Sequence, residues 1–241
     1  ALAFQAGMVE LISYWKAACP PDILIQPHRL TPDAAGFWED LYYMGLGEFR
    51  YLNGIRHPKQ DFLKIHSEGP SVPQARFMTD PQRILLPIGG GKDSAVSLAI
   101  LRESGRTLVP FLLNPLPAAW RTLATAGLGA EESLVFRRSL DPALLELNHR
   151  GYLNGHTPFS ALLAFYTLLA SHLSGCGQIA LSNESSANEA TVPGTDINHQ
   201  YSKSSHFEDR FRQYVSTTLG LDVDYFSLLR PLNELQIAAL F

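Results

Sequence analysis

The segment 89–94 reads GGGKDS and directly follows the apolar run 84–88. Because glycine has no side chain, the backbone can approach a ligand closely there. The spacing of apolar residues after the loop predicts a helix, whose first N–H groups and partial positive charge suit a phosphate group. The lysine adds a mobile charge and the serine a hydroxyl donor, while the aspartate would hold Mg²⁺, orient the loop or cap the helix. The candidate phosphate-binding residues are therefore Gly89, Gly90, Gly91, Lys92, Asp93 and Ser94.

This glycine loop differs from two familiar phosphate-binding loops. It has neither the G-x-x-x-x-G-K-[ST] spacing of the Walker A loop nor the G-x-G-x-x-G spacing of dinucleotide-binding folds. The alternative is a turn between a strand and a helix that binds nothing. Three glycines followed by a lysine, an aspartate and a serine at the end of a strand favour phosphate binding over that alternative.

A second group of reactive side chains lies in the polar segment 181–211. It offers two acids, Glu184 and Glu189, a potential base, His199, and a cation, Lys203. Compact domains seldom keep so long a polar connection unless it has a function, although a solvated loop is the alternative. The residues expected to contact substrate are Asn183, Ser185, Asn198 and, just ahead of a helix that Thr157 would cap, His156.

The elements that position these side chains follow an alternating pattern from residue 83 onward. Apolar runs predict strands, and runs with helical spacing predict helices between them. This alternation predicts an α/β fold, with a parallel sheet covered by helices on both faces. Ligands of such sheets bind beyond the carboxyl ends of the strands, so we expect the loops 89–94, 114–117 and 183–204 to line one site. The predicted strands are 83–88, 107–113, 133–138 and 178–182, and the predicted helices are 93–104, 117–127, 141–151 and 157–175.

The first 78 residues have a pattern of their own. A helix is predicted over 4–19, a strand over 22–27, and a second helix over 32–49 that Thr31 would cap. The proline-rich, polar stretch 69–83 is typical of a linker or an exposed connection. We therefore predict a small α+β region at 1–78 and an α/β domain at 79–241.

Composition narrows the classes of protein to consider. The chain has 241 residues, 46% of them hydrophobic, and a net charge of −4, so it lacks the basic character of most nucleic-acid-binding proteins. The apolar run 158–173 is shorter than a membrane span, and two distant cysteines fit a reducing compartment, so we expect a cytoplasmic protein without membrane contact. The chain begins without methionine and stops within a helical pattern, which leads us to expect a fragment of a longer protein.

The glycine loop resembles the SGGxDS loop of the PP-loop ATP pyrophosphatases, with Gly89 where most of that superfamily has serine. Several further segments resemble one family within it, the UDP-N-acetylmuramoyl-L-alanyl-L-glutamate epimerases. In chain order they are YWKAACPP, LYYMGLGEFRYLNG, IGGGKDS, LLELNHRGYLNGHTP, LSNESSAN, INHQYSK and YFSLLRPLNEL. The resemblance covers nearly the whole chain and implies a PP-loop fold, similar to the adenine nucleotide alpha hydrolases.

The resemblance also implies an activity. Members of the family use ATP and Mg²⁺ to invert the terminal L-Glu of UDP-MurNAc-L-Ala-L-Glu to D-Glu, a step of peptidoglycan precursor synthesis that releases AMP and pyrophosphate. It implies that the loop binds ATP, that Asp93 binds Mg²⁺, and that the substrate is a UDP-muramoyl dipeptide. The candidates for the base are His199, Lys203 and Glu184, in that order. The family's chains continue into a cysteine-containing C-terminal region.

Two other functions remain open for this sequence. One is a different PP-loop adenylating enzyme, which modifies tRNA or forms amides; the acidic balance and the absence of a paired-cysteine motif speak against the tRNA version. The other is a nucleotide sensor without catalytic activity. The presence of Lys92, Asp93 and Ser94 speaks against the sensor, because a decayed site would lose these residues first.

Overall fold

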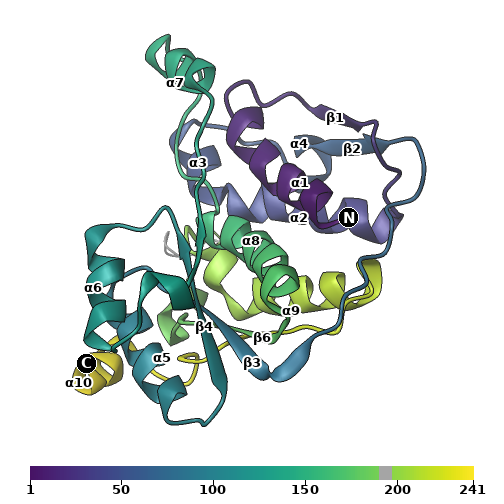
Figure 1. The fold of residues 1–241 in the computed structure, drawn as a ribbon. Coiled ribbons are helices and arrows are strands. Elements are labelled where there is room, and N and C mark those ends of the chain that lie inside the picture. The colour runs from purple at the N-terminus through teal and green to yellow at the C-terminus, as the bar shows by residue number, and fades with distance from the viewer. Residues whose placement is uncertain (190–196) are drawn as a thin grey trace. The chain divides into compact units, whose positions relative to one another are not determined.

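The computed structural model describes residues 1–189 and 197–241, drawn as a ribbon in Figure 1. The chain forms two compact units. The first contains residues 1–75, 140–162 and 188–220, and the second contains 76–139, 163–187 and 221–241. These units differ from the predicted division into 1–78 and 79–241, because two later segments pack with the N-terminal region.

The first unit is mainly helical, with one small sheet. Thr31 caps α2 as predicted, since its Oγ1 accepts a hydrogen bond from the backbone N–H of Ala34 at 3.2 Å. Strand β1 pairs in parallel with β2, which the sequence reading did not predict. The elements are α1 (Leu2–Trp15), β1 (Asp22–Ile25), α2 (Pro32–Gly45), α3 (Gly47–Leu52), α4 (Lys59–Phe62), β2 (Lys64–Ser67), α7 (Pro142–His149), the 3-10 turn η3 (Tyr201–Lys203), α9 (Ser205–Gln213) and the π-helical turn η4 (Tyr214–Thr218).

Buried contacts explain why the segment 188–220 belongs to the first unit. The indole N–H of Trp38 in α2 donates to the hydroxyl of Tyr214 at 3.1 Å, and that hydroxyl donates to Gln5 Oε1 at 2.8 Å. Arg210 in α9 pairs with Asp40 in α2 at 3.0 Å. Bonds between positions so far apart in the chain cannot be inferred from local sequence patterns.

The second unit is the predicted parallel α/β fold. Its five strands have the order β5-β4-β3-β6-β7, and every neighbouring pair is parallel, which confirms the predicted fold class. Strand β7 was not predicted from the sequence. The elements are β3 (Asp80–Pro87), α5 (Lys92–Arg102), β4 (Thr107–Leu113), α6 (Pro117–Thr125), the 3-10 turn η1 (Ala130–Glu132), β5 (Leu134–Phe136), α8 (Phe159–Ser174, which begins in the first unit), β6 (Cys176–Leu181), the 3-10 turn η2 (Ser185–Asn188), β7 (Asp224–Ser227) and α10 (Glu234–Leu240).

Helices cover both faces of this sheet. On one face, Leu98 of α5 and Leu123 of α6 pack with alternate residues of the strands, such as Leu86 and Leu112. Because successive side chains of a strand point to opposite faces, Phe111 lies on the other side. There its ring meets that of Phe136 at 5.0 Å between centroids, and Phe136 meets Tyr166 of α8 at 6.0 Å. Hydrophobic side chains on both faces thus hold the strand ends in place.

The strand order changes direction at one place in the sheet. From β3 the chain moves outward through β4 to β5, and then returns to the opposite side of β3 to form β6 and β7. The region beyond the carboxyl ends of β3 and β6 is therefore the switch point, at which open α/β sheets bind their ligands. The predicted loop 89–94 follows β3, and residues 183–186 follow β6.

Among the described residues, no helix combines the length and the apolar character that crossing a bilayer requires.

Candidate functional site

The glycine loop joins the end of β3 to the start of α5. Gly91 is the N-cap of this helix, and no described side chain caps it. The first N–H groups of α5 therefore remain available to an anion. The Ser94 hydroxyl donates to the carbonyl oxygen of Gly91 at 2.9 Å and accepts from the N–H of Gly90 at 3.2 Å. In this conformation Ser94 holds the shape of the loop.

The three glycines differ in what surrounds them. Gly90 has φ +89°, and a Cβ at this position would lie 2.4 Å from the backbone nitrogen of Ala119 and 2.6 Å from the carbonyl carbon of Ala118. The start of α6 therefore packs directly on Gly90. At Gly89 and Gly91, in contrast, an added Cβ would meet no atom of the described residues within 4 Å. The loop is thus closed against α6 at Gly90 and open at the two flanking glycines.

Lys92 lies between two carboxylates. Its Nζ is 2.7 Å from Asp93 Oδ1 and 3.0 Å from Glu234 Oε1. Hydrogen bonds to Asp93 and then to Glu234 raise the pKa of Lys92, and the hydrogen bond from Lys92 lowers the pKa of Glu234. The ammonium group is therefore charged throughout the physiological range. The two carboxylates also compete with any phosphate for it.

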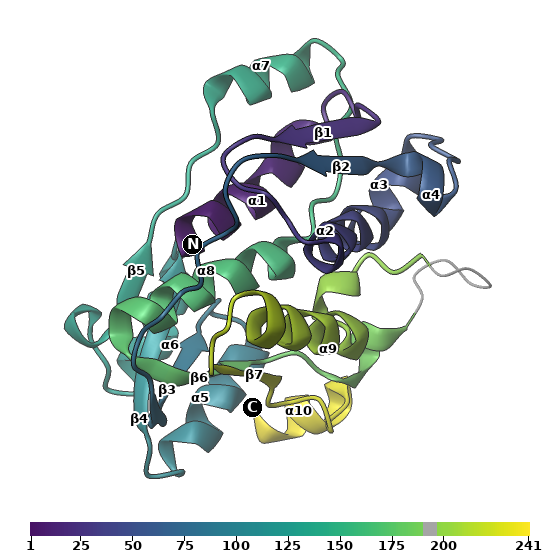
Figure 2. The same cartoon turned by 90° about the vertical axis from the view of Figure 1, so that its right-hand side faces the viewer.

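Glu234 is a residue of this neighbourhood that the sequence reading missed. It begins α10, whose N-terminus Asn233 caps together with Gln236. Ile237 of α10 packs against Val96 of α5, and α10 lies beside α5 in both views (Figures 1 and 2). The sequence shows the cap, but nothing in it indicates that the helix returns to the glycine loop.

The residues after β6 form a hydrogen-bonded network at the same switch point. Asn183 Nδ2 donates to Ser227 Oγ at 3.0 Å, and the backbone N–H of Ser185 donates to the carbonyl oxygen of Leu232 at 3.1 Å. Glu184 Oε1 accepts from Ser186 Oγ at 2.6 Å, and a side-chain hydrogen bond with Glu184 contributes to the lowered pKa of Glu234. The structure thus brings three predicted residues, Asn183, Glu184 and Ser185, into the unit that contains the glycine loop.

Arg230, which was not predicted, supports this network. Its Nη1 donates to the carbonyl oxygen of Glu184 at 2.9 Å, and its Nη2 donates to Ser227 Oγ at 3.1 Å. One guanidinium group thereby joins the ends of β6 and β7. The RPLNEL segment gave no sign of this contact, because Arg230 lies about 45 residues along the chain from Glu184.

The other predicted residues lie in the first unit. The rings of His156 and His199 are 6.3 Å apart between centroids, and Asn198 Oδ1 accepts from the N–H of Gln200 at 2.7 Å. Burial lowers the pKa of His156; the Glu48 carboxylate opposes this shift, while His199, Lys16 and Lys203 add to it. His156 Nε2 is buried and makes no hydrogen bond to a described residue. His156 is therefore neutral at neutral pH.

Lys16 holds the segment around His156 in place. Its side chain is buried, and its Nζ donates to Thr157 Oγ1 at 2.6 Å and to the carbonyl oxygen of Gly155. A buried ammonium group that bonds on both sides of His156 fixes the backbone of that residue. The sequence reading missed this role, because Lys16 looks like an ordinary polar residue at the end of an amphipathic helix. The segment 190–196 of the predicted loop 183–204 lies outside the described residues.

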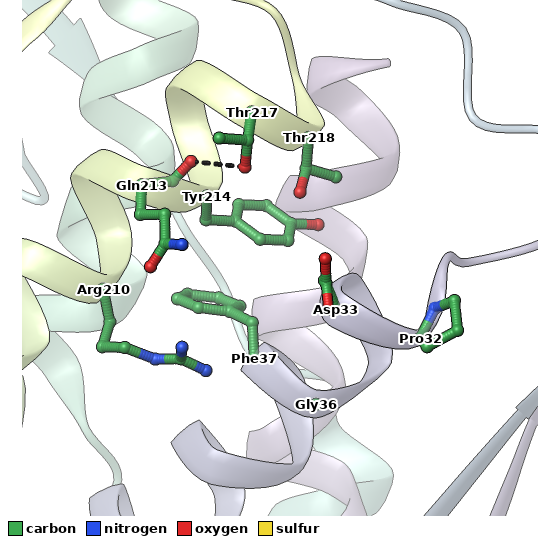
Figure 3. A pocket seen from close by; sticks show the side chains of 9 residues that line it. All are labelled: Pro32, Asp33, Gly36, Phe37, Arg210, Gln213, Tyr214, Thr217 and Thr218. Carbon is green, nitrogen blue, oxygen red and sulfur yellow. Dashed lines mark hydrogen bonds between the residues drawn. The ribbon is translucent and has the colours of Figure 1, made fainter.

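A polar pocket of about 240 Å³ lies elsewhere in the first unit, between α2 and η4 (Figure 3). The Phe37 ring stacks on that of Tyr214 with 4.2 Å between centroids, and Thr217 Oγ1 donates to the carbonyl oxygen of Gln213 at 2.8 Å. Burial raises the pKa of Tyr214 to about 12. None of the predicted site residues is among the lining residues, which are Pro32, Asp33, Gly36, Phe37, Arg210, Gln213, Tyr214, Thr217 and Thr218.

The second unit has a parallel sheet whose strand order reverses, and a loop lies at the switch point. These features place it among the ligand-binding parallel α/β folds. The whole chain is assigned more narrowly by comparison with known families. The model of the MurL N-terminal domain matches residues 1–228, so the chain belongs to this family. This confirms the resemblance that the sequence motifs indicated.

Curated relatives are similar over nearly all of this chain. A protein of Salinispora tropica is 39% identical over 235 residues, which are 95% of this chain and 50% of the relative. A protein of Xanthomonas oryzae pv. oryzae is 38% identical over 237 residues, or 97% of this chain and 51% of the relative. Both are named UDP-N-acetyl-alpha-D-muramoyl-L-alanyl-L-glutamate epimerase. This chain spans about half the length of these relatives.

Among solved structures, a predicted subunit of tRNA methyltransferase from Methanocaldococcus jannaschii is similar, with a TM-score of 0.38 and 18% identity over 66% of this chain and 73% of that one. A likeness of this degree carries no inference about function.

Proposed function

We propose that this chain supplies the ATP-binding and adenylating part of an enzyme that inverts the terminal L-Glu of UDP-MurNAc-L-Ala-L-Glu to D-Glu. The observation that carries the proposal is the glycine loop at the switch point, open at Gly89 and Gly91 and followed by the uncapped start of α5. Two curated relatives with the epimerase name, each about 40% identical, support the choice of substrate.

The chemistry explains why such an epimerase would use ATP as a substrate. Removing the α-proton next to a carboxylate places more negative charge on an anion, so this proton is very weakly acidic. In the proposed reaction a carboxylate oxygen attacks the α-phosphorus of ATP, the bond to the pyrophosphate breaks, and a mixed anhydride with AMP forms. The charge of the carboxylate is thereby removed. A base then takes the α-proton, a proton returns on the other face, and water releases AMP and the D-epimer.

The residues of the glycine loop fit the pyrophosphate end of ATP. Backbone N–H groups at the start of α5 would donate to its oxygens, and the Lys92 ammonium would stabilise the charge that develops as pyrophosphate leaves. Gly89 and Gly91 leave the space that such an approach needs. Most of the superfamily has a serine at position 89, whose hydroxyl can donate a hydrogen bond. This chain has Gly89 there, so only its backbone can contact the ligand.

Mg²⁺ is proposed to accompany the nucleotide. Magnesium sites that serve phosphoryl chemistry commonly use one or two carboxylates together with phosphate oxygens and water. Asp93, which follows Lys92 and is partly exposed, is the carboxylate of the loop that fits this role. When bound, the ion would supply positive charge at the triphosphate. Asp93 would then interact with the ion, so its ion pair with Lys92 would weaken.

The roles of the remaining predicted residues are part of the same proposal. The candidates for the base are Glu184, His199 and Lys203. Glu184 lies in the same unit as the glycine loop, whereas His199 and Lys203 lie in the first unit. Asn183, Ser185, Asn198 and His156 are the candidates for contacts with the substrate. A neutral imidazole can accept a proton, so the lowered pKa of His156 makes it a further candidate for proton transfer.

The test is exchange of the glutamyl α-proton in D₂O, followed by mass spectrometry, with the full-length protein and UDP-MurNAc-L-Ala-L-Glu. We expect exchange only when ATP and Mg²⁺ are present, together with pyrophosphate release that depends on the muropeptide. Lys92→Ala should abolish both, whereas Lys64→Ala, an exposed lysine of β2, should change neither. Exchange without nucleotide contradicts the adenylate step. Pyrophosphate release with tRNA instead of the muropeptide favours a tRNA-modifying enzyme, and nucleotide binding without AMP formation under any condition favours a sensor.

A further inference from the structure

The helix α10 carries apolar side chains on every side. Its seven residues read ELQIAAL, and since successive residues of a helix are turned by about 100°, the five apolar ones point in all directions around the axis. A helix that is hydrophobic all round is normally buried. Of these seven residues, however, Ile237 alone is buried, whereas Leu235 is 79% exposed and Leu240 is 59% exposed. The described part of the protein therefore covers one side of α10 and leaves the others open.

The covered side of α10 lies along α5. Lys92 pairs with Glu234 where the two helices begin. One turn further on, Val96 packs against Ile237, and α10 lies beside α5 in both views (Figures 1 and 2). Positions three or four residues apart share one face of a helix, so Phe241 comes next on this side. Phe241 is nevertheless 76% exposed. The contact with α5 thus buries α10 at Ile237 and leaves its end open.

A groove between α5 and α6 adjoins the end of α10. Its volume is about 500 Å³, and Phe241 is among the residues that line it. Leu98 and small side chains such as Ala99 and Ala118 make much of the lining apolar, together with two arginines and two threonines. Gly90 lines the groove as well, so the groove extends to the glycine loop. All the lining residues belong to the second unit.

The exposed residues of α10 and this groove form one surface, which we call the α10 face. It consists of the groove together with Leu235, Leu240 and Phe241. A helix of seven residues is about 10 Å long, so these three side chains lie close to one another and to the groove. An extended apolar surface marks a site where another polypeptide packs, whereas single exposed apolar residues need no explanation. The α10 face is therefore a surface of the kind that a partner covers.

Comparison with the relatives indicates what this partner is. The curated relatives are about twice as long as this chain, so half of each lies outside the matched part. The family model that matches residues 1–228 describes an N-terminal domain, and α10 lies beyond this match. The helix thus packs on the second unit without belonging to the domain that the family model describes. The remaining half of a full-length protein is the polypeptide to which such a helix leads.

We propose that the α10 face is the docking surface for the remaining half of the full-length protein, the residues beyond 241. A covalently linked half has a high effective concentration, so it covers the face without a second copy of the chain. Because Gly90 lines the groove, the docked half would also contact the glycine loop. This inference does not depend on the proposed function.

The accessibility of engineered cysteines in the full-length protein tests whether the face is covered. Leu235→Cys and Leu240→Cys are compared with Leu24→Cys, an exposed apolar residue of β1 in the first unit. Reaction with N-ethylmaleimide is followed by mass spectrometry of the peptide that contains each new cysteine, and each rate is divided by the rate of the same variant in urea. A covered cysteine reacts only when the contact opens, so we expect both α10 cysteines to react at least about tenfold more slowly than the cysteine at position 24.

A second measurement uses the cost of burying a charge. An unpaired carboxylate is costly in an apolar contact, whereas exposed positions tolerate it. We expect Leu235→Asp/Leu240→Asp to lower the melting temperature of the full-length protein by about 4 °C or more. The matched control is Leu24→Asp/Leu52→Asp, two exposed leucines of the first unit, which should change it by less than about 2 °C.

Three results would overturn the proposal. Two of them are α10 cysteines that react as fast as the cysteine at position 24, and an α10 aspartate variant that melts as its control does. The third is protection that disappears on dilution while analytical ultracentrifugation shows a dimer becoming a monomer, which would assign the face to a second copy. Protection that is independent of protein concentration supports the remaining half as the occupant. None of these measurements involves ATP or the muropeptide, so failure of the epimerase assay would leave the docking surface standing.

Discussion

Alanine at each of the three loop glycines should separate one glycine that the packing requires from two whose surroundings are open. At Gly90 the new Cβ would lie 2.4 Å from the backbone nitrogen of Ala119 and 2.6 Å from the carbonyl carbon of Ala118. Backbone atoms at the start of α6 cannot move aside as the end of a side chain can. Gly90→Ala therefore requires either a shift of α6 or a change of the loop.

The cost of Gly90→Ala can be worked out from two contributions. A residue with a Cβ in a left-handed conformation costs about 1–2 kcal/mol, and φ at this position is +89°. Overpacking against a rigid neighbour costs about 1–3 kcal/mol more. We expect the free energy of unfolding to fall by about 2–5 kcal/mol, a large part of the typical stability of a domain.

The two flanking glycines should behave in the opposite way. Gly91 has φ −89°, and neither Gly89 nor Gly91 would place a Cβ within 4 Å of a described atom. Gly89→Ala and Gly91→Ala should therefore change the free energy of unfolding by less than about 1 kcal/mol, with any gain arising from the less flexible unfolded chain. Most of the superfamily has serine at position 89, so a Cβ there is compatible with ATP, and Gly89→Ala should keep its affinity for ATP. At Gly91 the Cβ would border the uncapped N–H groups of α5, so the affinity of Gly91→Ala for ATP should fall.

The assay pairs urea denaturation with titration of a non-hydrolysable ATP analogue for all three variants. The expected pattern is loss of stability for Gly90→Ala, loss of ATP affinity at wild-type stability for Gly91→Ala, and wild-type behaviour for Gly89→Ala. Wild-type stability of Gly90→Ala would refute the close packing of α6 on the loop. Wild-type ATP affinity of Gly91→Ala would refute the loop as the phosphate cradle.

Two further predictions concern charges near the predicted site residues. Glu234→Gln removes one of the two carboxylates that share the Lys92 ammonium, so ATP affinity, measured by titration, should rise by about two- to fivefold; a fall would mean that Glu234 itself helps to bind the nucleotide. Burial holds the pKa of His156 below 6.5, so the unfolded chain takes up this proton first on acidification. The contribution of His156 to stability is therefore complete above pH 6.5 and is lost as the pH falls through the folded-state pKa. As the pH falls from 8 to 5, the urea midpoint should fall less for His156→Gln than for wild type. An equal fall in both proteins would contradict the lowered pKa of His156.

The parts of the fold that were predictable are those that local patterns determine. Apolar runs and helical spacing indicated β3, α5, β4 and α6 with the loop between the first two, because each element buries a face that its own residues define. The strand order was not predicted, because crossovers of one hand do not determine on which side of β3 the later strands pair. Strand β7 was missed, although the equally short β1 and the shorter β5 were predicted.

The parts of the candidate site that were missed depend on where distant segments meet. Lys16 is significant only because residues 155–157 return to it, and Glu234 only because α10 packs on α5 through Val96 and Ile237. The side chain of Asn114, which directly follows β4, bonds to the backbone of Arg138 after β5. In each case the residue type was visible in the sequence, whereas its partner is fixed only by tertiary packing.

The glycine loop shows how the residue types of a motif divide their roles once they are folded. Ser94, predicted as a donor to phosphate, uses its hydroxyl to join Gly90 to Gly91, and Gly90 accommodates α6. What remains for a ligand is the backbone around Gly89 and Gly91, the start of α5 and the charge of Lys92. Backbone N–H groups recognise a phosphate without regard to what is attached to it. Selection among phosphate ligands must therefore come from side chains rather than from the backbone of this loop.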